Sequence, residues 1–103
     1  MVLVTVLYPN TAGSRFDQDY YVQKHIPLVK ERWSSMGLQD ARIVRGVGAP
    51  GGGDATFQVI ALLTFESQDA LQKALAAHGA EIVGDVAQFT DVQPIIQVNE
   101  PFG

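Results

Sequence analysis

Two strand-forming segments of this chain carry apolar side chains on both faces, and this limits the folds available to it. Successive side chains of a strand point to opposite faces of a sheet. Across segments 2–8 and 56–65, one face holds Val2, Val4, Val6, Tyr8, Val59, Ala61, Leu63 and Phe65. The other face holds Leu3, Leu7, Ile60 and Leu62. Because soluble monomers rarely expose so large an apolar patch, we expect both faces of this sheet to be covered.

The remaining periodic segments complete a β-α-β-β-α-β order. A helical pattern runs from the N-cap residue Asp17 to residue 36, where Gly37 can take the left-handed closing position. Ser67 is expected to cap a second helix that ends at Gly79, with a further short helical piece at 80–89. Strands are expected at 2–8, 40–47, 56–65 and 91–98, and Pro94 interrupts the last of them, as an edge strand tolerates.

This order predicts one domain over residues 1–103, an α+β ferredoxin-like sandwich with a four-stranded antiparallel sheet and both helices on one face. Two helices cover only one face, and a second copy with two-fold symmetry is the simplest cover for the other. We therefore expect a homodimer through the open sheet face, in which the two sheets enclose a shared barrel-like interior. The space between sheet and helices is expected to bind a small apolar or aromatic ligand.

The composition excludes several classes of function. The chain has no cysteine, which rules out disulfides, thiolate metal sites and a cysteine nucleophile, and suits the cytoplasm. With a net charge of −4 and only 7 scattered Lys and Arg, it is expected to bind neither nucleic acid nor a membrane surface. Its apolar start is too short to span a bilayer and lacks the basic residues and cleavage site of a signal peptide.

The helical segment around Pro27 is the most distinctive motif of the chain. An apolar stripe at helical spacing is formed by Val22, Ile26, Val29, Trp33 and Met36, and a second row beside it by Tyr21, His25, Leu28 and Arg32. His25 therefore lies at the border of a buried face, where an imidazole is costly unless it has a hydrogen-bond partner or a functional role. Pro27 cannot donate to the carbonyl one turn back, near Gln23, so the helix should kink or step there.

His25 is the candidate catalytic residue. One interpretation makes it a general base, or a hydrogen-bond donor to an oxyanion in the cavity. The other makes it a structural histidine that bonds the carbonyl freed by Pro27. Tyr21 is a candidate to stack on or hydrogen-bond to a ligand, or else an amphipathic aromatic at a helix border.

The other candidate ligand-binding residues lie on strands. Tyr8 ends the first strand at the mouth of the expected cavity, and Phe65 faces either the helices or the cavity. Arg45 lies on an expected edge strand. It either enters the cavity and binds an anion, or it is a solvated charge that deters aggregation at the sheet edge. His78 is expected at the end of the second helix, where it interacts with the helix dipole, and the two histidines lack the acidic neighbours of a metal site. The string Gly-x-Gly-x-x-Gly at 46–51 precedes a strand rather than a helix, so we expect no dinucleotide site.

The run Tyr21…His25-x-Pro27-Leu28-Val29, after a strand that ends in Tyr8-Pro9, resembles the EthD domain family. The order and length of the elements resemble that family over the whole chain, while only the His-x-Pro segment is specific to it. The resemblance implies membership of the dimeric α/β-barrel superfamily, which includes cofactor-free monooxygenases, muconolactone isomerase-like proteins and haem-degrading enzymes. It implies an oxidoreductase-like protein of a degradation pathway, and it carries over Tyr21, His25 and Pro27 as site residues.

The leading hypothesis is a small cofactor-independent oxidoreductase or isomerase that acts on an apolar or aromatic compound. His25 would accept or relay a proton, and Tyr21 would orient the substrate. The alternative is a non-catalytic accessory protein that binds a reactive metabolite. Haem binding, with His25 or His78 as axial ligand, ranks lower, and an RNA-binding module is disfavoured because the third strand has no basic residue.

Overall fold

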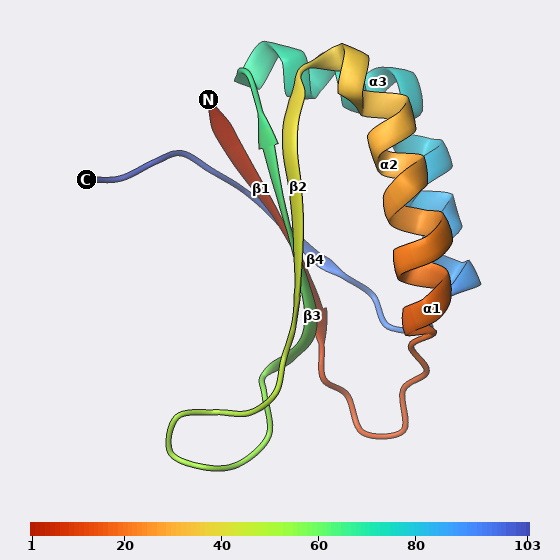
Figure 1. Ribbon diagram of the computed structural model, residues 1–103, viewed down its shortest axis with the longest axis vertical. Coiled ribbons are helices and arrows are strands. Elements are labelled where there is room, and N and C mark those ends of the chain that lie inside the picture. The colour runs from red at the N-terminus through yellow and green to blue at the C-terminus, as the bar shows by residue number, and fades with distance from the viewer.

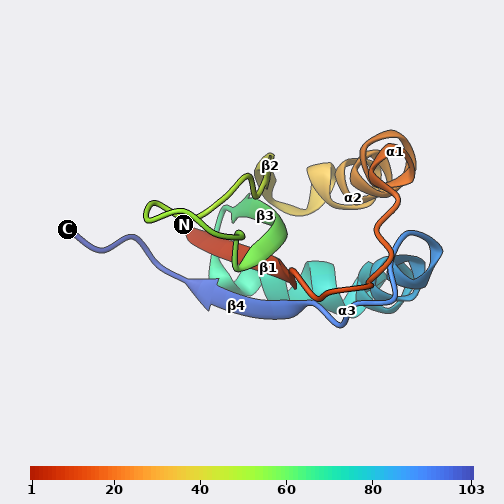
Figure 2. The ribbon, with the colours of Figure 1, turned by 90° about the horizontal axis from the view of Figure 1, so that it is seen from below.

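The elements of the computed structural model, which describes residues 1–103, follow a β-α-β-β-α-β order. They are β1 (Val2–Pro9), α1 (Gln18–Tyr20), a π-turn (Tyr21–His25), α2 (Ile26–Trp33), a 3-10 turn (Ser34–Met36), β2 (Leu38–Arg45), β3 (Phe57–Phe65), α3 (Gln68–Asp85), a second 3-10 turn (Val86–Gln88) and β4 (Ile95–Asn99). The strands form one antiparallel sheet in the order β2-β3-β1-β4. All helices lie on one face of the sheet (Figure 1), and the C-terminal tail projects away from them (Figure 2). The ferredoxin-like sandwich is confirmed.

The helix starts and the first helix end form as predicted. The Asp17 carboxylate accepts the N–H of Tyr20 at 3.1 Å, and the Ser67 hydroxyl accepts the N–H of Ala70 at 3.0 Å. Each cap satisfies a backbone donor that has no partner within its helix. Gly37 closes the first helical segment with φ at 98°, in the left-handed region.

Three predicted boundaries are wrong. α3 continues through Gly79 to Asp85, because Gly79 keeps a negative φ and the helix goes on to bury Ile82. A helical glycine costs roughly 1 kcal/mol relative to alanine, less than the roughly 1.5–3 kcal/mol of burying an isoleucine. Pro94 precedes β4 rather than interrupting it, because pairing with β1 starts at Ile95. β2 begins at Leu38, which pairs with Phe65.

The helix steps before Pro27 by means of a π-turn. The N–H of Ile26 donates to the carbonyl of Tyr21, five residues back, instead of to that of Val22. In an α-helix, Val22 would lie one turn before Ile26 on the buried face. In the wider π-turn, Tyr21 takes that place instead. Tyr21 is 2% exposed and Val22 is 53% exposed, so the prediction of Val22 as part of the buried stripe is wrong.

The two faces of the sheet differ in cover. Buried side chains face the helices from both central strands, namely Val4, Tyr8, Val59, Ala61, Leu63 and Phe65. On the open face, one apolar row crosses all four strands through the pairs Val44↔Ile60, Ile60↔Leu7 and Leu7↔Ile95. The next row is mixed, with Arg42, Leu62, Thr5 and Gln97 in register. The open face is thus most apolar at the end where β2 finishes and β4 begins.

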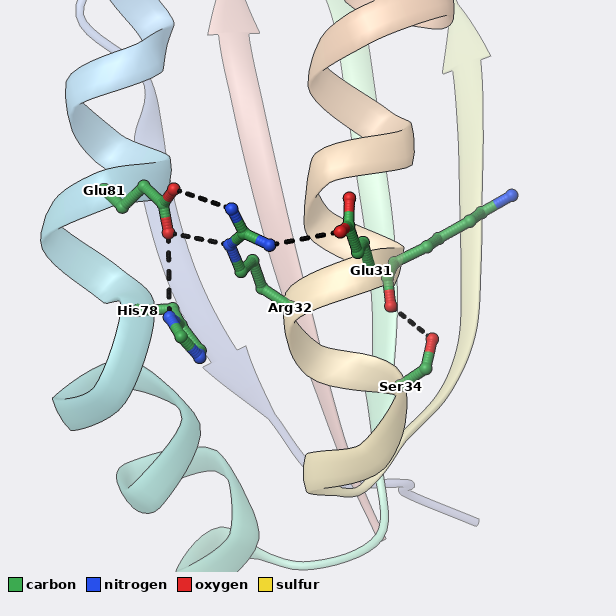
Figure 3. Close-up of polar contacts among 6 residues, drawn as sticks. Glu31, Arg32, Ser34, His78 and Glu81 are labelled. Atoms are coloured by element: carbon green, nitrogen blue, oxygen red, sulfur yellow. Dashed lines mark hydrogen bonds and ion pairs between the residues drawn. The ribbon is translucent and has the colours of Figure 1, made fainter.

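The two long helical segments are joined both in the core and at the surface. In the core, the indole N–H of Trp33 donates to the carbonyl of Ala74 at 2.9 Å, and its ring meets Phe65 edge-on at 5.6 Å. At the surface, Arg32 reaches across to Glu81 with a pair of hydrogen bonds of 2.9 and 3.2 Å (Figure 3). These contacts fix α3 against α2. None of the helices combines the length and apolarity needed to cross a membrane.

Replacing Gly37 with alanine should destabilise the protein by about 2 kcal/mol, because a left-handed alanine costs about 1–2 kcal/mol. Its Cβ would also lie 2.7 Å from the Cβ of Ala70. Gly84→Ala is the matched control: it lies in α3 with nothing within 4 Å of the new Cβ, and should stabilise the helix by about 0.5–1 kcal/mol. Urea denaturation of both variants measures these changes. Equal stability of the two variants would contradict this account of the helix end.

Candidate functional site

A cavity of about 390 Å³ lies between the helix-facing side of the sheet and the helices. β1 and β3 form its floor, α2 and α3 its walls, and the segment before β4 closes one end. Of its 23 lining residues, 18 are hydrophobic. The polar ones gather in two places, around His25 and at Thr90, Asp91 and Gln93. Such a cavity suits a small apolar molecule that offers few polar groups.

His25 is a polar residue of the cavity wall, and it pairs with Asp85, which does not itself line the cavity. His25 ends the π-turn and Asp85 ends α3, so the two side chains meet across the helix pair. The Nδ1 atom of His25 lies 3.0 Å from one Asp85 oxygen, and the hydroxyl of Tyr20 donates to the other oxygen at 2.8 Å. His25 is 4% exposed, and the Asp85 side chain is 18% exposed. The carboxylate is thereby held on both oxygens and oriented toward the imidazole.

The hydrogen bond to Asp85 determines which ring nitrogen is free. A carboxylate only accepts hydrogen bonds, so Nδ1 carries the proton, and the lone pair is on Nε2, which has no partner within the protein. Burial lowers the pKa of His25, and the hydrogen bond and charge of Asp85 oppose that effect without cancelling it. His25 is therefore neutral at pH 7 and has a free lone pair. The interpretation that it bonds the carbonyl freed by Pro27 is wrong.

Two aromatic rings, those of Tyr21 and Phe89, contact the imidazole. The ring of Tyr21 stacks on it at 5.6 Å and 17°, and Phe89 lies 4.7 Å from it. Tyr8 meets Tyr21 edge-on at 5.8 Å. The hydroxyl of Tyr21 is buried and has no hydrogen-bond partner in the protein, which is costly unless a ligand or water supplies one. Burial raises the pKa of both Tyr8 and Tyr21, so both hydroxyls stay protonated and able to donate.

The structure brings four of the six candidate residues to the cavity wall, namely Tyr8, Tyr21, His25 and Phe65. Pro27 lies outside it, exposed on α2, and influences the site through the π-turn. Arg45 also lies outside it, at a second pocket, where its guanidinium donates to Gln18 at 3.3 Å.

His78 lies in the middle of α3 rather than at its end, so the prediction of a helix-dipole role is wrong. Its Nδ1 is 3.6 Å from Glu81, outside the cavity (Figure 3). No group of three or more His, Cys, Asp or Glu side chains is placed to hold a metal ion.

Asp85 and Tyr20 are the site residues that the sequence analysis missed. Ending the second helix at Gly79 removed Asp85 from the helical face on which it lies. On an unbroken helix, Asp85 falls one turn after Ile82 and two turns after His78, at the edge of the buried face. An acidic residue at the edge of the buried face of this helix, Asp85, was the feature of the sequence that could have predicted a partner for His25.

Comparison with known proteins gives a family match. A model of the EthD domain matches residues 13–93, while no curated protein sequence matches significantly. An EthD-like protein from Ralstonia eutropha has 34% sequence identity and a TM-score of 0.88, over 96% of this chain and 89% of that one.

Two more distant solved structures share the fold alone. A dabb (dimeric α/β barrel) family protein with a ferredoxin-like fold from Mesorhizobium loti has 14% identity and a TM-score of 0.62, over 99% of this chain and 97% of that one. SnoaB, a cofactor-independent oxygenase from Streptomyces nogalater, has 12% identity and a TM-score of 0.64, over 99% of this chain and 92% of that one.

The pKa of His25 should lie below its ordinary value of 6.5 and should fall further in Asp85→Asn, which removes the charge that favours the imidazolium. An NMR titration of the imidazole signals measures both values. In the folded state a lowered histidine pKa excludes a proton that the unfolded chain binds. The protein should therefore keep its full stability above about pH 6.5 and lose part of it as the pH falls toward the folded pKa.

His25→Gln tests whether His25 causes this pH dependence of stability, because it removes the titrating group from the buried site. Its free energy of unfolding should depend less on pH between pH 7 and 5 than that of the wild type. A histidine titration above 6.5 for the His25 signals would contradict the dominance of burial.

Proposed function

The chain belongs to the EthD domain family, and from that premise we propose a cofactor-independent enzyme that deprotonates an apolar or aromatic substrate and allows dioxygen to attack the carbanion. The observation that carries the proposal is His25, buried in the wall of an apolar cavity and paired with the partly exposed Asp85 carboxylate. SnoaB, named as a cofactor-independent oxygenase, has the same fold, which is compatible with such chemistry.

His25 performs the first step. The lone pair on Nε2 takes a proton from an acidic C–H, such as a methylene next to a carbonyl group. The electron pair of that C–H bond stays on the substrate as a carbanion, which is delocalised onto the carbonyl oxygen. The imidazolium that forms is stabilised by the Asp85 carboxylate 3.0 Å from Nδ1.

The hydroxyl of Tyr21 stabilises the negative charge that develops on the substrate oxygen. Its buried hydroxyl is protonated and unpartnered, and its ring stacks on the catalytic imidazole at 5.6 Å. A hydrogen bond from this hydroxyl to the enolate oxygen would both position the substrate and lower the barrier to deprotonation. Tyr8 and Phe65 form the adjoining cavity wall against which the apolar part of the substrate packs.

Dioxygen is the co-reactant of the second step. It takes one electron from the carbanion, and the two radicals combine to form a C–O bond. The peroxide receives the proton held by His25, and loss of water with the second methylene hydrogen leaves a carbonyl group. The balance is CH2 + O2 → C=O + H2O, in which carbon is oxidised and dioxygen is reduced.

Anthrone, a tricyclic ketone with an acidic methylene group, is a suitable probe. The wild type should consume one dioxygen per anthraquinone formed, and His25→Gln should slow this at least about 100-fold, the usual contribution of a general base. The rate should rise with pH through the lowered pKa of His25, because the neutral imidazole is the active form. An oxygen electrode and the absorbance of the product measure the reaction.

His78→Gln is the control, because this histidine lies outside the cavity, and its rate should equal that of the wild type. Exchange of the methylene protons with deuterated solvent separates the two steps. Exchange without oxygen uptake would indicate an isomerase. Stoichiometric binding with neither exchange nor uptake would replace this proposal with the accessory binding protein.

We further propose a homodimer through the open sheet face, centred on the apolar row Val44, Ile60, Leu7 and Ile95. Burying this row removes exposed apolar area from water, which is the main driving force of obligate association. Sedimentation equilibrium should give twice the chain mass of 11.1 kDa. Ile60→Glu should give monomers, while Val47→Glu, at a loop position 90% exposed, should leave the dimer intact. A wild-type monomer at micromolar concentration would defeat the proposal.

A further inference from the structure

A second pocket of about 280 Å³ lies beside the main cavity, between α1 and the edge of the sheet. We call it the outer pocket; its apolar lining comes from Phe16, Val22, Ile43, Val59 and the edge residue Val44, with Tyr21 on one side and Arg45 at the rim. Val59 lines the outer pocket, and Ala61, two residues along the same face of β3, lines the main cavity. The two spaces therefore adjoin along one strand.

Tyr21 is the one residue that lines both spaces. Its ring meets Phe16 of the outer pocket at 5.3 Å and His25 of the main cavity at 5.6 Å. The side chain is thus a wall between the two compartments, and it carries the buried hydroxyl that has no partner in the protein. This hydroxyl needs a hydrogen-bond partner that the protein itself does not supply.

Arg45 is the cation of the outer pocket, and no carboxylate neutralises it. Its guanidinium donates to the neutral Gln18 amide at 3.3 Å and takes part in none of the ion pairs of the structure. Arg32, by contrast, pairs with both Glu31 and Glu81. An unpaired guanidinium at the rim of an apolar pocket, in a chain of net charge −4, is complementary to a carboxylate with an apolar body.

We propose that the outer pocket binds the carboxylate end of an elongated apolar acid, with Arg45 as its cation and Tyr21 as the wall shared with the main cavity. The apolar body packs on Phe16, Val22 and Ile43, and Tyr21 separates it from the cavity that holds His25. The binding of this acid in the outer pocket does not depend on the proposed function.

Calorimetric titration with decanoate and with methyl decanoate at pH 8 tests the recognition of the carboxylate. The wild type should bind the acid about fivefold more tightly than the ester, the upper value for an exposed ion pair. Arg45→Gln should abolish this preference. Arg42→Gln is the matched control: it lies on the same strand and is exposed, but it belongs to the open face, in register with Leu62, so the preference should remain.

Equal binding of acid and ester by the wild type would overturn the proposal. So would an equal effect of the two arginine variants, which would mean that the acid senses only the overall charge of the surface. On binding decanoate, the methyl signals of Ile43 and Val59 should shift. Shifts confined to Leu7 and Ile60 would place the acid on the open face of the sheet and would also overturn it.

Tyr21→Ala tests the shared wall, because it joins the two compartments. The ratio of the affinity for hexadecanoate to that for decanoate should rise at least fivefold, whereas Tyr21→Phe, which keeps the ring, should leave it unchanged. An unchanged ratio in Tyr21→Ala would refute the wall. Because these are binding measurements, they stay informative even if anthrone oxidation fails, so the two proposals fail separately.

Discussion

Pro27 has no N–H to offer the preceding turn, and the geometry of the site depends on how the helix accommodates that loss. The chain widens into a π-turn just before the proline, and the extra residue rotates everything upstream. Tyr21 replaces Val22 on the inward side and so becomes the side chain between the two pockets. His25 is buried beside it, as its helical spacing predicts.

Burial lowers the pKa of His25, and the nearby Asp85 carboxylate opposes this effect in part. The apolar cavity disfavours the imidazolium, while the carboxylate favours it, and burial prevails. The result is a neutral histidine with a fixed tautomer and a counter-charge ready for the proton it takes up. The same apolar surroundings keep the tyrosine hydroxyls protonated, so the cavity combines one acceptor with donors that do not titrate near neutral pH.

The parts of the site that could be predicted are those encoded by local chemistry. The step before Pro27, the inward tendency of His25 and the caps at Asp17 and Ser67 follow from a missing donor, from periodicity and from side-chain acceptors. The predictions failed where packing outweighed a local preference. Gly79 is a helix-ending residue by propensity, yet burial of Ile82 carries the helix past it. That error also hid Asp85, because the residue is significant only at the end of an unbroken helix.

The sequence by itself determined the β-α-β-β-α-β order, the two apolar faces of the central strands and the family to which the chain belongs, because alternation, helical spacing and the His-x-Pro motif are local properties. The tertiary structure alone decided that Asp85 orients His25, that Tyr21 separates two pockets and that Arg45 belongs to the outer one. The pair His25–Asp85 is 60 positions apart along the chain and the pair Arg45–Gln18 is 27, and their distances in space come from the packing of α3 and β2 around the π-turn. Spacing along the chain carries no information about such distances.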